Sequence, residues 1–350
     1  MSNEIFILTL GAMFGAFAVW AFKQLPQEKW QILASVPIVK DPNGCWHGLN
    51  FTYYGLLTAN ALVLSGAMLI ILLGAANIHA MVIVTIMTAL LLITLPAAKW
   101  VARLVEGKNH TFTVAGALFV GMLSAPLVLR IFNGIMSRAQ LREVPVVTAL
   151  AALMIVFAIG EGLGRVACIS FGCCYGKPLA HIHPVLRRVF QKWNFVFSGD
   201  MKKISYASKM NGQEVVPIQA ITSVLYVITG LFSALLFLWG HFSLSFLLAV
   251  MVTQGWRCFS ELLRADSRGD GKISAYQVMG LMAICYSLAL LAILPADPSV
   301  SPKLDLGLDA LWHPEVFLFL QGLWAVVFVF FGKSMVTGAE ISFHLHEDRI

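Results

Sequence analysis

Two arginines and a glutamate lie in long apolar segments, where a charged side chain is costly and usually has a function. Arg257 and Glu261 are four residues apart in the stretch QGWRCFSELLRAD. A helix would place both on one face, where Glu261 can orient Arg257 and offset its charge. Arg165 ends an earlier apolar segment. Guanidinium groups bind phosphate through paired hydrogen bonds, so these residues predict an anion site. A structural ion pair that locks two helices is the alternative.

The residues around Arg165 predict a tight turn beside that site. The stretch reads GRVACISFGCCYGKP, with glycines at positions 164, 172 and 176. Because glycine has no side chain, backbone N–H groups near these positions can approach the same anion. The anion expected in a membrane is the phosphodiester of a phospholipid.

The elements that must position these residues are membrane helices. Of the 350 residues, 59% are hydrophobic and 12% are charged, and the mean hydropathy is +0.80. A soluble domain carries roughly 25% charged residues, so this chain cannot hide its apolar surface from water by folding alone. The apolar runs are long and continuous, whereas barrel strands alternate over ~10 residues. The spans are therefore helices.

Nine segments approach the ~20 apolar residues that cross a bilayer, which predicts an all-α, polytopic membrane helix bundle. The first segment follows MSNE, which lacks the positive charge of a signal peptide, so we expect an uncleaved helix. The predicted spans are 5–22, 53–73, 79–103, 113–132, 144–168, 216–238, 243–263, 275–294 and 315–332.

Loop charges give conflicting indications about orientation. Side A holds the N-terminus and loops such as 133–143, whereas side B holds 169–215, 264–274 and most of the loop Lys and Arg. The positive-inside rule places side B in the cytoplasm. Basic loops that bind anionic lipid head groups would instead allow side B to face outward.

Four stretches, in the family's order, resemble the prolipoprotein diacylglyceryl transferases. GRVACISFGCCYGKP resembles their Gly-Arg-hydrophobic-Gly-Asn-Phe-x-Asn-Gly-Glu-x-Tyr/Trp-Gly-Arg signature. FTYYGLLTANALVL resembles their Trp-Tyr-Gly-Leu helix opening, VVPIQAITSVLYVITGL their His-Pro-Ser-Gln-Leu-Tyr-Glu start, and GWRCFSELLRAD their Arg-Phe-x-x-Glu-Phe-x-Arg segment. The resemblance covers a core of seven spans over 52–294. Residues 1–51 would add an N-terminal span and linker, and 295–350 a C-terminal span and polar tail.

The resemblance implies transfer of a diacylglyceryl group from phosphatidylglycerol to the lipobox cysteine thiol of a prolipoprotein, with release of glycerol-1-phosphate. By matched position, Arg165 and Arg257 would bind phosphate and Glu261 would orient them during catalysis. The implied partners are phosphatidylglycerol, the prolipoprotein signal peptide and membrane lipid, in a bacterial inner (plasma) membrane with side B outward. The implied substrate-binding residues are Tyr54, Gly164, Gly172, Cys173, Tyr175, Gln219 and Arg264.

The family's histidine motif is altered in this chain. Its Phe-His-Gly-Gly-Leu sequence aligns with GKNHTFTVAGALFVG, where Thr113 or Val114 replaces the essential histidine. His110 lies a few residues upstream and is the candidate catalytic substitute, with an interfacial structural histidine as the alternative. Glu161, one turn before Arg165, is either another candidate base or an ion-pair partner.

Further departures leave other functions open. The family asparagines fall on Cys168 and Phe171, its glutamate on Cys173, and a histidine on Val216. The lipid half of the site is thus better preserved than the thiol half. The alternatives are a paralogue that uses phosphatidylglycerol with an unknown acceptor, a non-catalytic phospholipid-binding or transport protein, and a redox protein built on Cys173–Cys174.

The sequence predicts no metal ion, no cofactor and no nucleic-acid partner. No CxxC or His/Cys ligand spacing occurs among the six cysteines. DSRGDGKISAYQ, over 266–277, is similar to a calcium loop, but Arg268 and Gln277 stand at two ligand positions. An Asp- and Gly-containing turn is the better interpretation.

Overall fold

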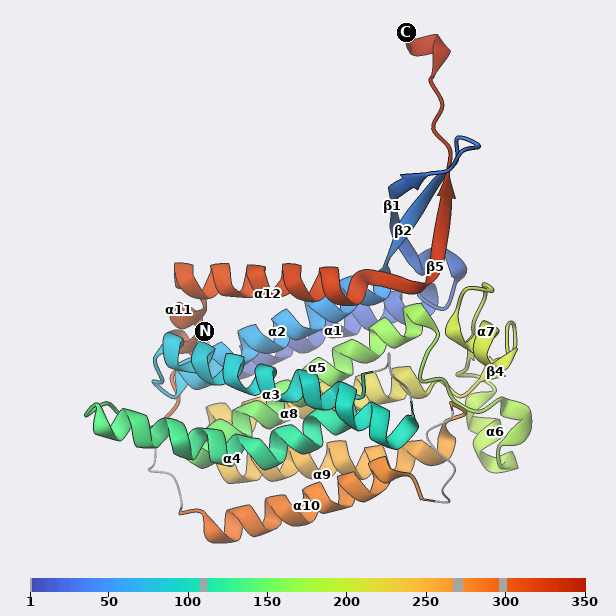
Figure 1. Ribbon diagram of the computed structural model, residues 1–350. Coiled ribbons are helices and arrows are strands. Elements are labelled where there is room, and N and C mark those ends of the chain that lie inside the picture. The colour runs from blue at the N-terminus through green and yellow to red at the C-terminus, as the bar shows by residue number, and fades with distance from the viewer. Residues whose placement is uncertain (1, 108–111, 267–272, 296–300) are drawn as a thin grey trace.

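The chain forms a bundle of long helices that lie side by side (Figure 1). The computed structural model describes residues 2–107, 112–266, 273–295 and 301–350. Within these ranges nine helices are long and apolar enough to cross a membrane, which confirms the predicted polytopic bundle. They are α1 (Asn3–Gln24), α2 (Tyr53–Ala75), α3 (Ala80–Glu106), α4 (Val114–Arg138), α5 (Val146–Phe171), α8 (Ile218–Leu238), α9 (Phe242–Ser260), α10 (Ala275–Ile293) and α12 (Pro314–Gly332).

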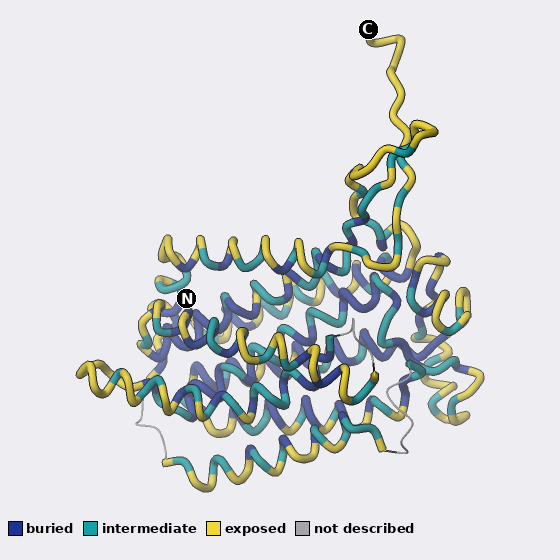
Figure 2. The backbone as a smooth tube through the Cα atoms, in the orientation of Figure 1, coloured by how far each residue is buried: buried dark blue, intermediate teal, exposed yellow. Residues whose placement is uncertain are grey.

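Helix α5 is the central element of the bundle. It packs against α2, α8 and α9, and a larger share of it is buried than of any other candidate span in the described residues. Figure 2 shows this buried centre in dark blue beneath a more exposed outer layer. The helix continues to Phe171, three residues beyond the predicted end of its span. Arg165 therefore lies inside the helix, among its neighbours, and not at its end.

Close packing of α5 against α8 depends on Gly162. A Cβ at this position would lie 2.7 Å from Val227 Cγ2 and 3.1 Å from the Ser223 carbonyl oxygen, both on α8. A Cβ on Gly164, two residues further along α5, would have no atom within 4 Å. Only the first of these glycines sets the distance between the two helices.

Most of the smaller elements gather at one end of the bundle, whereas α11 (Leu304–Leu311) lies at the other (Figure 1). The strands β1 (Ile32–Lys40), β2 (Trp46–Thr52) and β5 (Lys333–Ile341) form an antiparallel sheet with β2 in the centre, which projects from the bundle (Figure 1). These strands were not predicted from the sequence: β1 and β2 are consecutive, whereas β5 pairs with β2 from almost 300 residues away. The remaining elements are η1 (Glu28–Trp30), η2 (Leu179–His181), α6 (Pro184–Phe190), β3 (Phe195–Val196), α7 (Lys203–Ser208), β4 (Glu214–Val215), η3 (Glu261–Leu263), α11 (Leu304–Leu311) and η4 (Glu347–Arg349).

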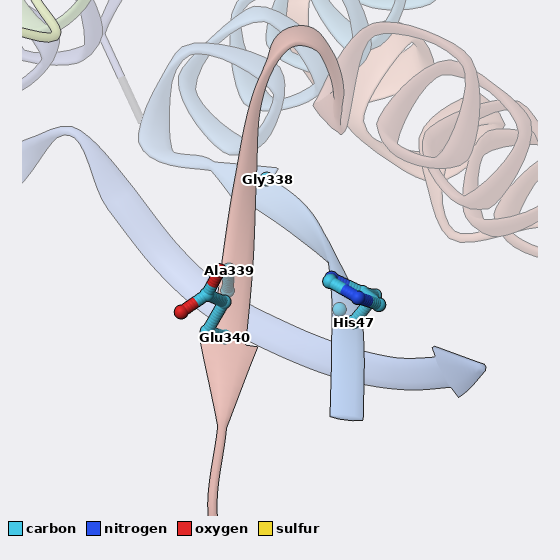
Figure 3. Close-up of a pocket in the computed structure, with 5 residues that line it drawn as sticks. His47, Gly338, Ala339 and Glu340 are labelled. Carbon is cyan, nitrogen blue, oxygen red and sulfur yellow. The ribbon is translucent and has the colours of Figure 1, made fainter. Parts of the chain in front are cut away.

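A pocket between β2 and β5 lies on this projecting sheet (Figure 3). Its lining includes His47, Gly338, Ala339 and Glu340. None of these belongs to the helices that carry the intramembrane arginines, so the pocket is separate from the predicted anion site.

Lys202 fastens the long polar segment between α5 and α8 to the bundle. Its side chain is fully buried, and Nζ donates hydrogen bonds to the carbonyl oxygens of Leu25, at 3.1 Å, and Ser170, at 2.7 Å. Burial lowers the pKa of Lys202 to about 8, since the charged ammonium loses its hydration.

Replacement of Gly162 by alanine tests the packing of α5 on α8. We expect Gly162→Ala to lower the free energy of unfolding by about 1–3 kcal/mol, because α8 must move to admit the new methyl group. The matched control is Gly164→Ala, which should keep or raise stability because alanine favours a helix by roughly 1 kcal/mol over glycine. Thermal unfolding in detergent measures both, and equal losses in the two variants would contradict this account.

Stability should depend on pH through Lys202. Between pH 8 and 10.5, the ordinary pKa of a lysine, the unfolded chain keeps the Lys202 proton that the folded chain has released. The free energy of unfolding therefore rises with pH across this window, by up to about 3 kcal/mol. Melting temperatures at pH 7.5 and 9.5 should show this rise in the wild type and in the exposed control Lys192→Met. If Lys202→Met keeps the full rise, Lys202 is not its source.

Candidate functional site

A buried carboxylate shared by two arginines lies toward the C-terminal ends of α5 and α9. Arg165 and Glu161 are one turn apart on α5, and an Arg165 Nη2–H donates a hydrogen bond to Glu161 Oε1. Arg257, on α9, brings its Nη2 to 3.5 Å from the same oxygen. The side chains of Glu161 and Arg257 are each 6% exposed, and that of Arg165 is 12% exposed. Two guanidinium groups thus share one carboxylate, which leaves this trio with an excess positive charge.

Hydrogen bonds between α8 and α9 fix the position of Arg257. The hydroxyl of Tyr226 donates to the Thr253 carbonyl oxygen at 2.6 Å, one turn before Arg257. The Trp256 Nε1–H donates to Thr222 Oγ1 at 2.9 Å. These two bonds hold α9 against α8. Arg257, on the same part of α9, is thereby directed toward Glu161 on α5.

Several polar atoms around the arginines have no hydrogen-bond partner in the described residues. They include the Nε atoms of Arg165 and Arg257, Ser223 Oγ and Gln219 Oε1, all of them buried. A buried donor without an acceptor costs about 1–3 kcal/mol, and more when it is charged. The excess charge and the two guanidinium Nε–H donors together suit an anion that accepts hydrogen bonds.

The C-terminal turn of α5 brings three cysteines together beside Arg165. Gly172 adopts a left-handed conformation with φ 69°, and the Cys173 N–H donates to the Cys168 carbonyl oxygen at 3.1 Å. Cys174 also has a positive φ, of 54°. The Sγ atoms of Cys168 and Cys174 are 4.0 Å apart, and all three Sγ atoms lie within 4.8 Å of one another. Hydrogen bonds to Cys168 and Cys173, followed by the charges of Arg264 and Arg165, hold the Cys174 pKa well below its usual range.

Three predicted binding residues lie at this turn. Tyr54, on α2, has its ring centroid 5.4 Å from that of Phe171 and lies within electrostatic range of Glu161 and the three cysteines. Gln219 is buried at the start of α8, and its Nε2–H donates to the Cys173 carbonyl oxygen at 2.9 Å. Arg264 forms a two-point ion pair with Asp266, at 2.8 and 2.7 Å, and its charge acts on Cys174.

Other predicted residues have different surroundings from those expected. The carboxylate beside Arg257 in the described residues is that of Glu161, whereas Glu261 lies beyond the end of α9, in η3, within electrostatic range of Cys258. The Tyr175 side chain is buried in an apolar cluster, and its hydroxyl hydrogen-bonds to Ser208 on α7.

The glycines also differ from the expectation that they present N–H groups to an anion. Gly164 lies inside α5, where the helix uses its N–H, and the Gly172 N–H donates to the Ile169 carbonyl oxygen. Gly176 instead permits close approach to Val216, whose carbonyl oxygen a Cβ would meet. His110 lies outside the described residues.

Two features of the site were not predicted from the sequence. Glu161 and Arg257 are 96 positions apart, so no local spacing indicates their contact. Ser223 was not selected, although it lies one turn after Gln219 on the same helix and faces Gly162. The available signal was the spacing of Gln219 and Ser223, two polar residues one turn apart in a largely apolar helix.

The fold and the site define a multi-pass helical membrane protein with a buried cationic centre. The family model for prolipoprotein diacylglyceryl transferase matches residues 45–293. The chain belongs to this family, as the four motifs predicted, and the family indicates a transferase of lipoprotein biogenesis. A sequence comparison with curated proteins finds no match.

Neutralising Glu161 should expose the repulsion between the two arginines. In Glu161→Gln the guanidinium groups of Arg165 and Arg257 lose their common counter-charge, and we expect a loss of about 3–5 kcal/mol in the free energy of unfolding. The control is Glu143→Gln, an exposed carboxylate between α4 and α5. Unfolding curves of both variants in detergent provide the measurement. A Glu161→Gln variant as stable as the control would show that the shared contact contributes little.

Proposed function

We propose that the protein transfers the diacylglyceryl group of phosphatidylglycerol to the lipobox cysteine thiol of a prolipoprotein and releases glycerol-1-phosphate. The observation that carries the proposal is the buried Arg165–Glu161–Arg257 trio, with its excess positive charge and its unpartnered Nε–H donors. A phosphodiester supplies one negative charge and several acceptor oxygens, so it complements the trio in charge and hydrogen bonding. We place the reaction in the bacterial inner membrane, with the cysteine-lined end facing outward.

The proposed reaction forms a thioether and breaks a phosphate ester. The acceptor thiol loses its proton to water, and its sulfur attacks the glyceryl carbon. The carbon–oxygen bond breaks, and glycerol-1-phosphate leaves with the bonding electrons. Arg165 and Arg257 stabilise the negative charge that develops on this leaving group. Glu161 already accepts from both guanidinium groups, so its role is to hold them in place for the phosphate.

The residues at the α5 turn would receive the head group and the acceptor. Tyr54 and Gln219 lie next to the cysteines and are buried or half-buried. Gln219 Oε1 has no partner in the described residues and can accept a hydrogen bond from a glyceryl hydroxyl. The fit of polar atoms to a glycerol-based head group supports phosphatidylglycerol as donor.

One observation favours a second candidate, a phospholipid-binding protein without transfer activity. Thr113 or Val114 stands at the position of the family's histidine. Thr113 is buried at the start of α4, and its N–H donates to the Ala98 carbonyl oxygen. Its neutral hydroxyl is no base for a thiol at physiological pH. A binding protein would retain phosphatidylglycerol intact, whereas an enzyme would release glycerol phosphate.

Substitution of either arginine should abolish transfer. We expect Arg165→Ala and Arg257→Ala to reduce release of glycerol phosphate at least 100-fold, because removal of one charged donor at a developing anion costs about that factor. The assay uses purified protein, phosphatidylglycerol and a synthetic lipobox peptide, and it also records the diacylglyceryl mass gain of the peptide. The control is Arg138→Ala, at the exposed end of α4.

The same assay separates the candidates. Release that depends on the peptide supports the transferase, and release without a mass gain on the peptide indicates a different acceptor. Intact phosphatidylglycerol with no release supports the binding protein. Wild-type turnover in Arg165→Ala would end the proposal that this trio binds the phosphate.

A further inference from the structure

We propose that Cys168, Cys173 and Cys174 bind one thiophilic metal ion, with Zn²⁺ the best match, and that a fourth coordination position receives the thiol of the acceptor. The inference rests on the proposed function for its catalytic part. The metal site itself rests on the geometry of the three cysteines.

The distances suit a trigonal set of sulfur ligands. Zinc–sulfur bonds are about 2.3 Å, which places sulfur atoms of a tetrahedral site roughly 3.8 Å apart. Cys168 and Cys174 have their Sγ atoms 4.0 Å apart, and the third Sγ lies within 4.8 Å of both. Side-chain movements of less than about 1 Å would thus complete the ligand set.

The backbone holds this arrangement in place. Cys168 lies on the last turns of α5, and the left-handed Gly172 returns the chain so that Cys173 caps the helix. Cys174 adopts φ 54°, a conformation that costs about 1 kcal/mol or more for a residue with a Cβ. Unfavourable backbone geometry persists where the surroundings require it, often at binding sites.

The surrounding charges compensate three thiolates. A Zn²⁺ ion with three thiolates carries a net charge of −1. Arg165 and Arg264 are both close enough to act electrostatically on Cys174, and both are largely buried. These two cations would offset the negative charge of the complex.

Three protein ligands are the pattern of a catalytic metal and not of a structural one. Structural zinc sites have four protein ligands, whereas catalytic sites keep an open position for water or substrate. Among the described residues, the group that the geometry brings together contains these three cysteines alone. An acceptor thiol in the open position would be deprotonated outright. The metal would therefore supply what the missing histidine cannot.

The metal-bound thiolate of the acceptor would be the nucleophile of the transfer. The acceptor thiol binds the metal and releases its proton to water. Its sulfur lone pair forms the bond to the glyceryl carbon, the carbon–oxygen bond breaks, and glycerol-1-phosphate leaves with that electron pair. The thioether product is uncharged and a weaker ligand, so it dissociates. Cys168 is one turn after Arg165, and so the nucleophile and the phosphate would meet at the same end of α5.

Cobalt titration of the full-length protein tests the metal site without reference to activity. We expect reduced, chelator-stripped protein to bind one equivalent of Co²⁺, with intense thiolate charge-transfer absorption and the visible bands of a tetrahedral ion. Zn²⁺ should displace the cobalt. Cys168→Ser and Cys174→Ser should each weaken binding at least 10-fold, and Cys285→Ser, an exposed cysteine of α10, should bind as the wild type does.

Three results would overturn the metal site. They are an absence of cobalt absorption in the wild type, retention of full binding in both cluster variants, and a Cys168–Cys174 disulfide that persists under mild reductant. If a serine variant fails to fold, the wild-type titration alone still decides the question.

The transfer assay distinguishes failure of this inference from failure of the proposed function. Stripped protein should lose peptide modification and regain it on addition of Zn²⁺, while it still retains phosphatidylglycerol. Transfer that is unaffected by metal removal would overturn the inference and leave the transferase standing. Bound cobalt in a protein that never releases glycerol phosphate would support the metal site and end the transferase proposal.

Discussion

The carboxylate of Glu161 lies between the guanidinium groups of Arg165 and Arg257, and this contact determines where α5 and α9 meet. In a bilayer neither arginine is tolerable without a counter-charge. One carboxylate for two cations offsets only part of the charge, however, and the arrangement stays complementary to an anion. The contact that joins the two helices therefore also leaves the excess positive charge on which the proposed chemistry relies.

The end of α5 joins the two halves of the proposed reaction. Arg165 belongs to the phosphate side, and one turn later Cys168 begins the thiol side. Lys202 anchors the polar segment beneath this turn, and Gly162 lets α8 approach closely enough to bring Gln219 to the Cys173 carbonyl oxygen. Packing, loop attachment and site geometry therefore depend on one helix, which explains why it is the most buried candidate span described.

The sequence was sufficient for the spans, the family and the identity of the two arginines, because hydropathy and charge at membrane depth are local properties. It was insufficient for the partner of Arg257, since Glu161 approaches from a different helix while Glu261 shares the local spacing. Cysteine spacing did not indicate that Cys168, Cys173 and Cys174 lie together, because the left-handed turn at Gly172 folds the chain back beside the end of α5. The projecting sheet was not predicted; its third strand, β5, comes from a segment almost 300 residues after β2, although β1 and β2 are consecutive.

The most direct test of the central claim is a measurement of bound lipid. Native mass spectrometry of the purified protein would compare retention of phosphatidylglycerol with retention of diacylglycerol, which has the same acyl chains and no phosphate. The account predicts one phosphatidylglycerol per chain, displaced by excess glycerol-1-phosphate and lost in Arg257→Gln. Equal retention of diacylglycerol, unaffected by glycerol-1-phosphate, would contradict the claim that the shared arginines bind the phosphate.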